Sequence, residues 1–376
     1  MKSAFIYSHE LGRFDFGYDH PYKPERAIKA YDLCTRYGVL NYPWMEVLSA
    51  GPIDPQILTL FHDPHYLELL KEASLGRVSL EILAHGLGTR DNPILPGIYE
   101  WSLMTCGSTF LGADLIARKQ LEVAFNPLGG FHHARQSRAE GFCYINDVAV
   151  VGRELLGRGF RVAFVDIDAH HCNGVQEAFY EDDRFLVISL HESGKTLYPG
   201  TGETSEIGKG RGRGFTVNIP LAPGTDDEVF LSAFREVVPA LVSAFQPDIL
   251  VAELGADTQI SDPLTHLRLT NNGYQEAVRI LSTLCPRILA LGGGGYDVYR
   301  TARCWTLAWS VLNGVEPEDE FAGLVGGMMF GPEQEVGSLR DQPHPTVGPV
   351  KEKAKDQVRK ALSFIREEVF PIHGIP

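Results

Sequence analysis

The sequence lacks closely spaced cysteines, long apolar runs and an export signal. Its six cysteines are scattered without a CxxC pair, which argues against a zinc ribbon and a disulfide framework. We expect them to be reduced and mostly buried. No stretch is long and apolar enough to span a membrane, and the N-terminus MKSAFIYSHELGRF has no signal-peptide core. The sequence therefore predicts a cytoplasmic protein that is not inserted in a membrane.

Positive charge is also in short supply. The chain has 34 Lys and Arg against 48 Asp and Glu, a formal net charge of −14. This balance disfavours nonspecific nucleic-acid binding and is compatible with a cationic substrate. The basic glycine run at 208–214 is too short to change that expectation, and we interpret it as a hairpin loop. We expect no nucleic-acid partner, and the sequence leaves the oligomeric state open.

What remains is the composition of a globular protein, with 44% hydrophobic and 22% charged residues among 376. Helical and extended patterns alternate along most of it, which predicts an α/β fold with a mainly parallel sheet flanked by helices. Strands are expected at 2–8, 123–126, 162–165, 185–191, 248–254 and 287–291. Helices are expected at about 24–37, 64–74, 98–118, 146–157, 174–181, 226–244, 271–284, 298–312 and 351–369, with irregular chain at 85–97 and 315–350.

No repeat or linker divides the chain. We therefore expect a single domain over residues 1–376, with a core of about 1–312 and a C-terminal extension of about 313–376. Polar residues gather directly after the predicted strands, where open α/β sheets bind their ligands.

The stretch RVAFVDIDAHHCNG at 161–174 carries the densest of these polar groups. If the chain stays extended beyond its strand, Asp166, Asp168 and His170 point to the same side. Asp257 follows the apolar part of a later strand. From these residues we derive the ligand set Asp168, His170 and Asp257. One nitrogen and two oxygen donors suit zinc, iron(II) or another divalent metal and leave a coordination position open. The alternative is an aspartate that caps a turn and a histidine satisfied by hydrogen bonds.

Two further clusters offer acid–base chemistry. His132 and His133 are either metal ligands, a general base and acid, or structural loop residues. The acid–base role is open to them because histidine titrates near neutral pH. Tyr296 follows four glycines, and its phenol is placed to donate a hydrogen bond to a developing oxyanion. The run GGGGYDVY does not match the dinucleotide-binding fingerprint. From local sequence, Arg26 is expected to be a surface charge on a helix.

Five motifs together resemble the histone deacetylase superfamily, with the closest likeness to its bacterial acetoin-utilisation and histone-deacetylase-like members. They are NPLGGFHHARQSRAEGFCYIND (126–147), VDIDAHHCNGVQEAF (165–179), YPGTG (198–202), LGADTQISDPL (254–264) and LGGGGYDVYRTARCWT (291–306). The resemblance covers roughly residues 1–310. It implies an arginase/deacetylase fold and a metal-dependent amidohydrolase that removes acetyl or other acyl groups from N-acyl-lysine side chains through a metal-activated water.

The resemblance also implies roles for individual residues. It implies zinc, with iron(II) possible, at the three ligands derived above. His132 and His133 carry the proton transfers, with His133 as the general base, and Tyr296 binds the oxyanion. Asp166 orients His132 from behind. Asn173 stands where many members have an aspartate, so it supplies no charge and His133 should be less basic.

Substrate and cation contacts follow from the same likeness. The implied substrate contacts are Gly141, Phe142, Tyr198, Leu264, Gly294 and Gly295, with Asp91 at the rim. A structural K⁺ or Na⁺ is implied at Asp166, Asp168, His170, Ser189 and Leu190. Arg26 resembles the arginine of an internal cavity behind the site.

Three alternatives to an acyl-lysine deacylase stay open at this point. The same chemistry on a small acylated amine such as an acetylpolyamine is the first, although Leu264 stands where polyamine-specialised members can carry an acid. A catalytically silent acyl-lysine-binding module is the second. The third is an arginase-type ureohydrolase, which would need a two-metal ligand set that this sequence does not match.

Overall fold

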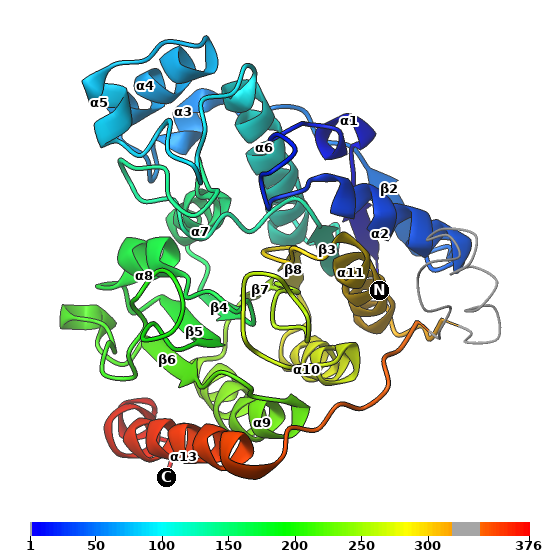
Figure 1. The fold of residues 1–376 in the computed structure, drawn as a ribbon, viewed down its shortest axis with the longest axis vertical. Helices are drawn as coiled ribbons and strands as arrows, with labels where there is room; N and C mark the ends of the chain where they lie inside the picture. The colour runs from blue at the N-terminus through cyan, green and yellow to red at the C-terminus, as the bar shows by residue number, and fades with distance from the viewer. Residues whose placement is uncertain (1, 318–338) are drawn as a thin grey trace.

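A computed structural model describes residues 2–317 and 339–376, and their centre is one eight-stranded sheet (Figure 1). Neighbouring strands all pair in parallel, in the order β2-β1-β3-β8-β7-β4-β5-β6. The strands are β1 (Ser3–Ile6), β2 (Met45–Leu48), β3 (Val123–Asn126), β4 (Val162–Asp166), β5 (Phe185–Glu192), β6 (Thr216–Leu221), β7 (Ile249–Glu253) and β8 (Ile288–Leu291). Seven of them are buried along their whole length, β2 being the exception, as expected for a sheet covered on both faces. The predicted α/β fold with a parallel sheet is confirmed.

Helices cover both faces of this sheet. The helices α6 (Ile98–Ala117), α7 (Asp147–Gly157) and α8 (Asn173–Phe179) form one row, and α2 (Glu25–Arg36), α11 (Val298–Leu312), α10 (Asn271–Leu284) and α9 (Asp227–Phe245) form the other (Figure 1). The short helices α1 (His9–Gly12), α3 (Pro55–Leu58), α4 (Pro64–Ser74) and α5 (Leu80–Ala84) precede α6. Side-chain caps begin many of these helices, as at Asn146 of α7 and Asp297 of α11.

A long helix, α13 (Gly348–Phe364), packs against α9 and the outer strand β6. The ammonium group of Lys351 lies 2.5 Å from Asp226, the N-cap residue of α9, and both side chains are buried. Gln357 donates a hydrogen bond to the main-chain oxygen of Pro220 in β6. The chain then continues through one π-helical segment (Ile365–Val369) and a short 3₁₀ turn (Phe370–His373).

Most predicted elements occur within one or two residues of their expected bounds, and three expectations need correction. The glycine run at 208–214 is not a hairpin loop, because β5 and β6 pair in parallel and the chain between them is a crossover. Strands β2 and β6 were not expected. The irregular segment predicted at 315–350 falls largely outside the described residues, and α13 begins inside it, at Gly348.

The six cysteines all lie in the described part of the chain, buried and free, as predicted. Among the described helices, none combines the length and apolar character needed to cross a membrane.

Candidate metal and catalytic site

The site begins where β4 ends. Strand β4 ends at Asp166, and two side-chain hydrogen bonds to the main chain then stabilise a turn. Asp166 Oδ1 accepts from the Asp168 amide, and Asp168 Oδ1 accepts from the His170 amide, each at 2.8 Å. The extended geometry assumed from the sequence therefore does not continue to His170. The turn instead leaves Asp166 at the strand end and carries Asp168 and His170 outward to the carboxyl edge of the sheet.

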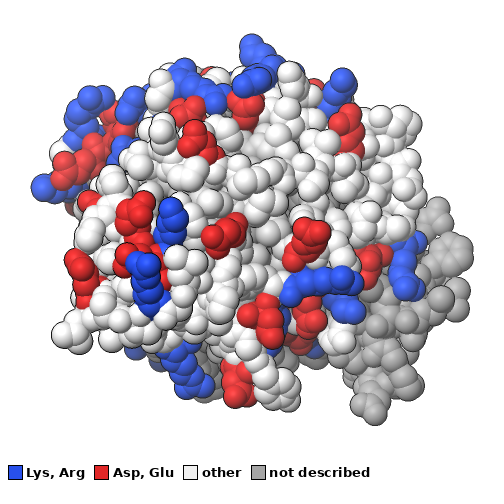
Figure 2. Space-filling model, turned by 90° about the horizontal axis from the view of Figure 1, so that it is seen from above, with Lys and Arg blue, Asp and Glu red and all other residues white. Residues whose placement is uncertain are grey.

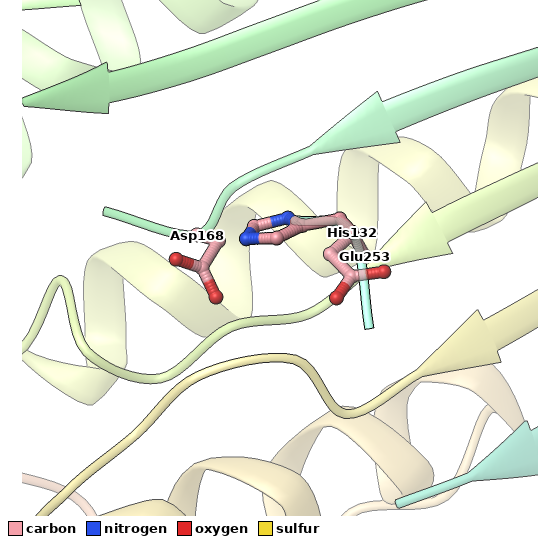
Figure 3. Close-up of side chains that lie close together, drawn as sticks. All are labelled: His132, Asp168 and Glu253. Carbon is pink, nitrogen blue, oxygen red and sulfur yellow. The ribbon is translucent and has the colours of Figure 1, made fainter. Parts of the chain in front are cut away.

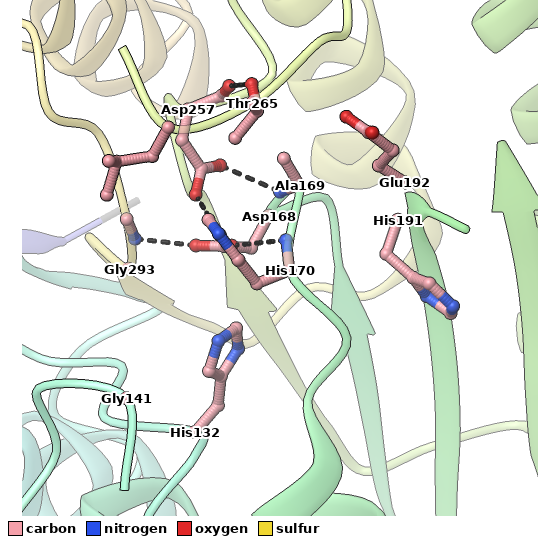
Figure 4. Close-up of polar contacts among 12 residues, drawn as sticks. His132, Gly141, Asp168, Ala169, His170, His191, Glu192, Asp257, Thr265 and Gly293 are labelled. Atoms are coloured by element: carbon pink, nitrogen blue, oxygen red, sulfur yellow. Dashed lines mark hydrogen bonds and ion pairs between the residues drawn. The ribbon is translucent and has the colours of Figure 1, made fainter. Parts of the chain in front are cut away.

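Asp168, His170 and Asp257 converge at this edge, with one ligand atom of each lying within 4.8 Å of the others (Figure 4). His170 Nδ1 is 2.8 Å from Asp257 Oδ2 and 3.3 Å from Asp168 Oδ1. All three side chains are buried. Burial lowers the pKa of His170, but its hydrogen bonds with Asp168 and Asp257 outweigh this and raise the pKa to about 10. Two buried carboxylates that draw a positive charge between them fit a divalent cation.

A second buried group, His132, Asp168 and Glu253, meets the same distance criterion (Figure 3). Neither carboxylate oxygen of Glu253 has a hydrogen-bond partner in the described part of the chain. Burial and the nearby charge of Asp166 raise the pKa of Glu253 well above its ordinary value. The group around His170 is the better candidate for a metal site, because two carboxylates, those of Asp168 and Asp257, both approach its imidazole within 3.3 Å.

His132 and His133 form a buried pair beside this group. Their Nε2 atoms lie 3.2 Å apart, while His132 Nδ1 is 3.1 Å from Asp166 Oδ2 and His133 Nδ1 is 2.7 Å from Asn173 Oδ1. Burial lowers the pKa of His132, but the Asp166 charge outweighs it and raises the pKa above its ordinary value. Burial and the neighbouring His132 hold the pKa of His133 well below its ordinary value. A proton on the pair therefore resides on His132, and His133 is the unprotonated partner.

Tyr296 faces the same space from the loop after β8. Its ring meets those of His170 and Phe142 edge-on, with centroids 6.0 and 5.7 Å apart, and its amide donates to Asp262 Oδ2. Burial and the charge of Asp257 raise the pKa of the Tyr296 phenol well above its ordinary value. The phenol therefore keeps its proton and remains a hydrogen-bond donor.

The glycine loop before Tyr296 is held from behind by Arg26. The guanidinium is buried and donates to the main-chain oxygens of Gly293 and Gly295 at 2.6 and 2.8 Å. It also lies over the rings of Tyr22 and Trp305. The expectation from local sequence that Arg26 is a surface charge was wrong. The amphipathic pattern of α2 does not reveal that the helix packs beside a glycine loop whose main-chain oxygens accept hydrogen bonds from Arg26. Gly294 donates its amide to Asp168 Oδ2.

A narrow pocket opens onto these groups. It is lined by Tyr22, Gly129, Gly130, Phe131, His132, His133, Gly141, Phe142, Cys143, Asp168, Gly293, Gly294 and Tyr296. Gly141 has a positive φ, and a Cβ there would lie 2.5 Å from the His133 ring, so only glycine fits. Phe142 also has a positive φ, at 68°, a strained conformation that is more common at functional sites.

The remaining predicted substrate residues lie at and beyond the rim. The ring of Tyr198 is 5.2 Å from that of His133, and its side chain is 40% exposed. Asp91 is exposed and shares a shallow surface groove with Gly141 and Tyr198. Leu264 is half-buried and donates its amide to Asp262, but it does not line the pocket.

The predicted monovalent-cation residues come from β4, the turn after it and β5. Ser189 pairs in register with Asp166, and Leu190 follows it in the buried strand. The Ser189 hydroxyl is 2.8 Å from His191 Nδ1.

Two residues of the site were missed from the sequence. Glu253 ends β7 beside Asp166, a position that the strand-end rule marks for attention. Glu140 contacts Asn173 from the rim loop and directly precedes Gly141. No spacing rule pairs residues 33 positions apart in irregular chain, so the sequence carries no signal for this contact.

Comparisons with known proteins agree with this geometry. The family model described as "Histone deacetylase domain" matches residues 20–312. The chain is 35% identical to the acetoin utilization protein AcuC of Bacillus subtilis, over 97% of this chain and 98% of the relative. The crystal structure of an HDAC homologue from Aquifex aeolicus superposes with a TM-score of 0.84 and 33% identity, covering 96% of this chain and all of that one. An HDAC homologue complexed with SAHA matches with the same TM-score and coverage at 32% identity. This chain belongs to the histone deacetylase superfamily, in its AcuC-like branch.

Proposed function

We propose that this deacetylase hydrolyses the amide bond of N-acyl-lysine side chains, acetyl-lysine above all. The observation that carries the proposal is the convergence of three kinds of group on one narrow pocket. These are the ligand group, which reaches the pocket through Asp168, the histidine pair and Tyr296. Each group has a distinct task in amide hydrolysis.

Asp168, His170 and Asp257 are the proposed holders of a divalent metal, zinc or iron(II). Such an ion polarises a carbonyl oxygen and lowers the pKa of water. Their donor set fits the ion, because two buried carboxylates otherwise face each other across a single imidazole. We further propose a K⁺ or Na⁺ at Asp166, Asp168, His170, Ser189 and Leu190, where it would offset part of the buried negative charge.

The histidine pair is the proposed proton carrier. His133 is unprotonated because its pKa lies well below its ordinary value, and it is the proposed acceptor of a proton from the attacking water. His132, held by Asp166, keeps a positive charge beside it and supplies a proton on the side of the leaving amine.

Tyr296 is the proposed oxyanion donor. Its phenol keeps its proton because its pKa is raised well above the ordinary value, and its ring centroid lies 6.0 Å from that of His170. A donor that is fixed before the reaction stabilises the charge that develops on the carbonyl oxygen without having to reorganise.

The rings of Phe142 and Tyr198 form the proposed walls for the acyl-lysine stem, which is a thin apolar rod. Gly141, Gly294 and Gly295 bring main chain close to it, Leu264 stands at the gate, and Asp91 is the proposed contact to a peptide backbone at the rim. A small acylated amine such as an acetylpolyamine remains the second candidate substrate. The apolar Leu264 favours the peptide, because it offers no charge to a polyamine ammonium group.

At the level of the whole chain, we propose one catalytic domain over residues 1–376, with a core of about 1–312 and an extension of about 313–376. The acyl-lysine is expected to reach the site as part of a protein or peptide in the cytoplasm.

A turnover panel on the purified protein tests the proposal. Acetyl-lysine peptides, longer acyl-lysine peptides and acetylpolyamines are compared by kcat/KM, with bound metal measured in the same samples. We expect acyl-lysine peptides to be the best substrates. Turnover of acetylpolyamines alone would replace the proposed substrate, and tight peptide binding without turnover would favour a silent binding module.

A further inference from the structure

A chain of polar contacts runs from His133 to the rim of the pocket. His133 Nδ1 lies 2.7 Å from Asn173 Oδ1, and Asn173 Nδ2 donates to Glu140 Oε1 at 3.3 Å. The other oxygen of Glu140 accepts from Arg135 Nε at 2.7 Å. Asn173 is buried, and Glu140 is half-buried at the pocket mouth. The amide of Asn173 therefore lies between one imidazole and one carboxylate.

The two ends of a side-chain amide have opposite hydrogen-bonding character, whereas the two oxygens of a carboxylate are equivalent. Its oxygen accepts hydrogen bonds and its NH₂ donates them, so a 180° flip reverses what a neighbour receives. Glu140 accepts hydrogen bonds from Asn173 and Arg135, and the Tyr198 phenol also hydrogen-bonds to it, so Glu140 acts as an acceptor toward its neighbours. It therefore requires the NH₂ of Asn173 to point toward Glu140 and the oxygen to point toward His133.

The orientation of the amide determines the tautomer of His133. With Asn173 Oδ1 facing it, Nδ1 must carry the hydrogen, and the lone pair is left on Nε2, which lies 3.2 Å from His132 Nε2. With the amide reversed, Nδ1 would accept and Nε2 would carry the hydrogen. Building on the proposed function, we propose that Glu140 is a positioning residue that holds Asn173 in the orientation keeping Nε2 of His133 available as the base.

Two simpler roles for Glu140 predict different behaviour. In the first, Glu140 acts only as an anchor of the rim loop through Arg135, which also bonds Glu177. In the second, Glu140 acts only on the substrate, because its charge lies near Tyr198 and, together with burial, raises the pKa of that phenol. An anchor would act regardless of what stands at position 173, and a substrate contact would act on KM.

A double-mutant cycle separates these roles. Glu140→Ala is made in the wild-type chain and in an Asn173→Asp chain, and kcat and KM are measured with an acetyl-lysine peptide. In the wild-type background we expect kcat to fall on the order of 10-fold, since a general base in the wrong tautomer contributes little. In the Asn173→Asp background we expect no loss, because a carboxylate at 173 accepts from Nδ1 in either orientation and removing Glu140 relieves repulsion between two acids.

The matched control is Glu177→Ala, which removes the other partner of Arg135 without touching Asn173. It should leave kcat unchanged. An equal loss from Glu140→Ala in both backgrounds, or a change confined to KM, would overturn the inference. If Glu140→Ala does not fold, Glu140→Gln replaces it, since its own NH₂ removes the constraint on the amide. Absence of turnover in the metal-loaded wild type would count against the proposed function instead.

Discussion

The hydroxyl of Tyr296 offers the cleanest test at the scale of one residue. Tyr296→Phe removes one oxygen from a phenol that lies beside His170 and Phe142 and leaves the ring packing intact. We expect kcat to fall by about 10²–10³-fold, as for other single oxyanion donors. Bound metal, measured by elemental analysis, should stay near the wild-type level. Unchanged turnover would exclude the oxyanion role.

Asp257 tests the ligand group. Asp257→Ala removes one of the two carboxylates that hold His170, and it also removes the acceptor for the Ala169 amide. We expect metal content and activity to be lost together, because two remaining ligands are too few for a stable divalent site. The check is metal stoichiometry after dialysis. Full metal occupancy in a folded Asp257→Ala variant would show that Asp257 is not a metal ligand.

Single residues also show where sequence reasoning reaches its limit. Asp168, His170 and Asp257 were predicted to meet because each follows a strand of one parallel sheet, and strand ends share an edge. Glu140 was not predicted, and local sequence placed Arg26 on the surface although the family resemblance put it behind the site. Both act through contacts between segments far apart in the chain, Arg26 reaching Gly293 and Gly295 across about 270 residues. Neither periodicity nor spacing carries information about such contacts.

At the scale of elements, α13 depends on one buried ion pair. Lys351 Nζ lies 2.5 Å from Asp226, which also caps α9 by accepting from the Val229 amide. Lys351→Met keeps the aliphatic stem but leaves the buried Asp226 with only its main-chain donors and no cation. We expect the free energy of unfolding to fall by about 2–3 kcal/mol, measured by urea unfolding.

The exposed pair Lys360–Asp356 on the same helix serves as the control. Lys360→Met should leave the free energy of unfolding nearly unchanged, because this pair is exposed to solvent. A similar effect of the two substitutions would show that burial of the Lys351 pair is not what matters.

Elements that were predicted well share a physical reason. Strands β3, β4, β5, β7 and β8 are buried on both faces, so their sequences are continuous apolar runs. Strand β2 is exposed at two of its four positions and β6 includes Asn218 and Pro220, so neither gives that signal. Because strand β6 was not predicted, the glycine run after β5 was interpreted as a hairpin loop. Tertiary pairing, not local sequence, decides that it is a crossover.

At the scale of the whole molecule, His62 links stability to pH. It is buried, with Nε2 accepting from the Asn146 amide and Nδ1 next to the Gln136 oxygen. Burial lowers its pKa from 6.5 to about 4. The folded state therefore resists protonation while the unfolded state takes up a proton below about pH 6.5. The stability that His62 contributes is present above that pH and is lost as the pH falls toward 4.

Urea unfolding at about pH 7.5 and about pH 5 measures this linkage. From the two pKa values we expect His62 to account for a loss of about 2 kcal/mol between these pH values. His62→Gln does not titrate, so the loss should be smaller by about that amount in the variant. Identical pH dependence in both proteins would mean that His62 is not the linked group.

Charge on the surface is mixed at this scale. On the face that carries α4, α5 and α6, Lys and Arg side chains are interspersed with Asp and Glu around a largely uncharged centre (Figure 2). Several exposed apolar side chains come from the segment containing these short helices, namely Leu60, Leu75, Val78, Leu80 and Leu83.

The position of α13 bears on how this protein can be handled in solution. Strand β6 is the last strand of the sheet, and α13 packs along it with Gln357 bonded to its main chain. An uncovered outer strand is a template for further strands from other chains. A chain shortened to residues 20–312, the part that matches the family model, would lose this cover and also β1. We expect such a fragment to aggregate during expression although it keeps the whole proposed site.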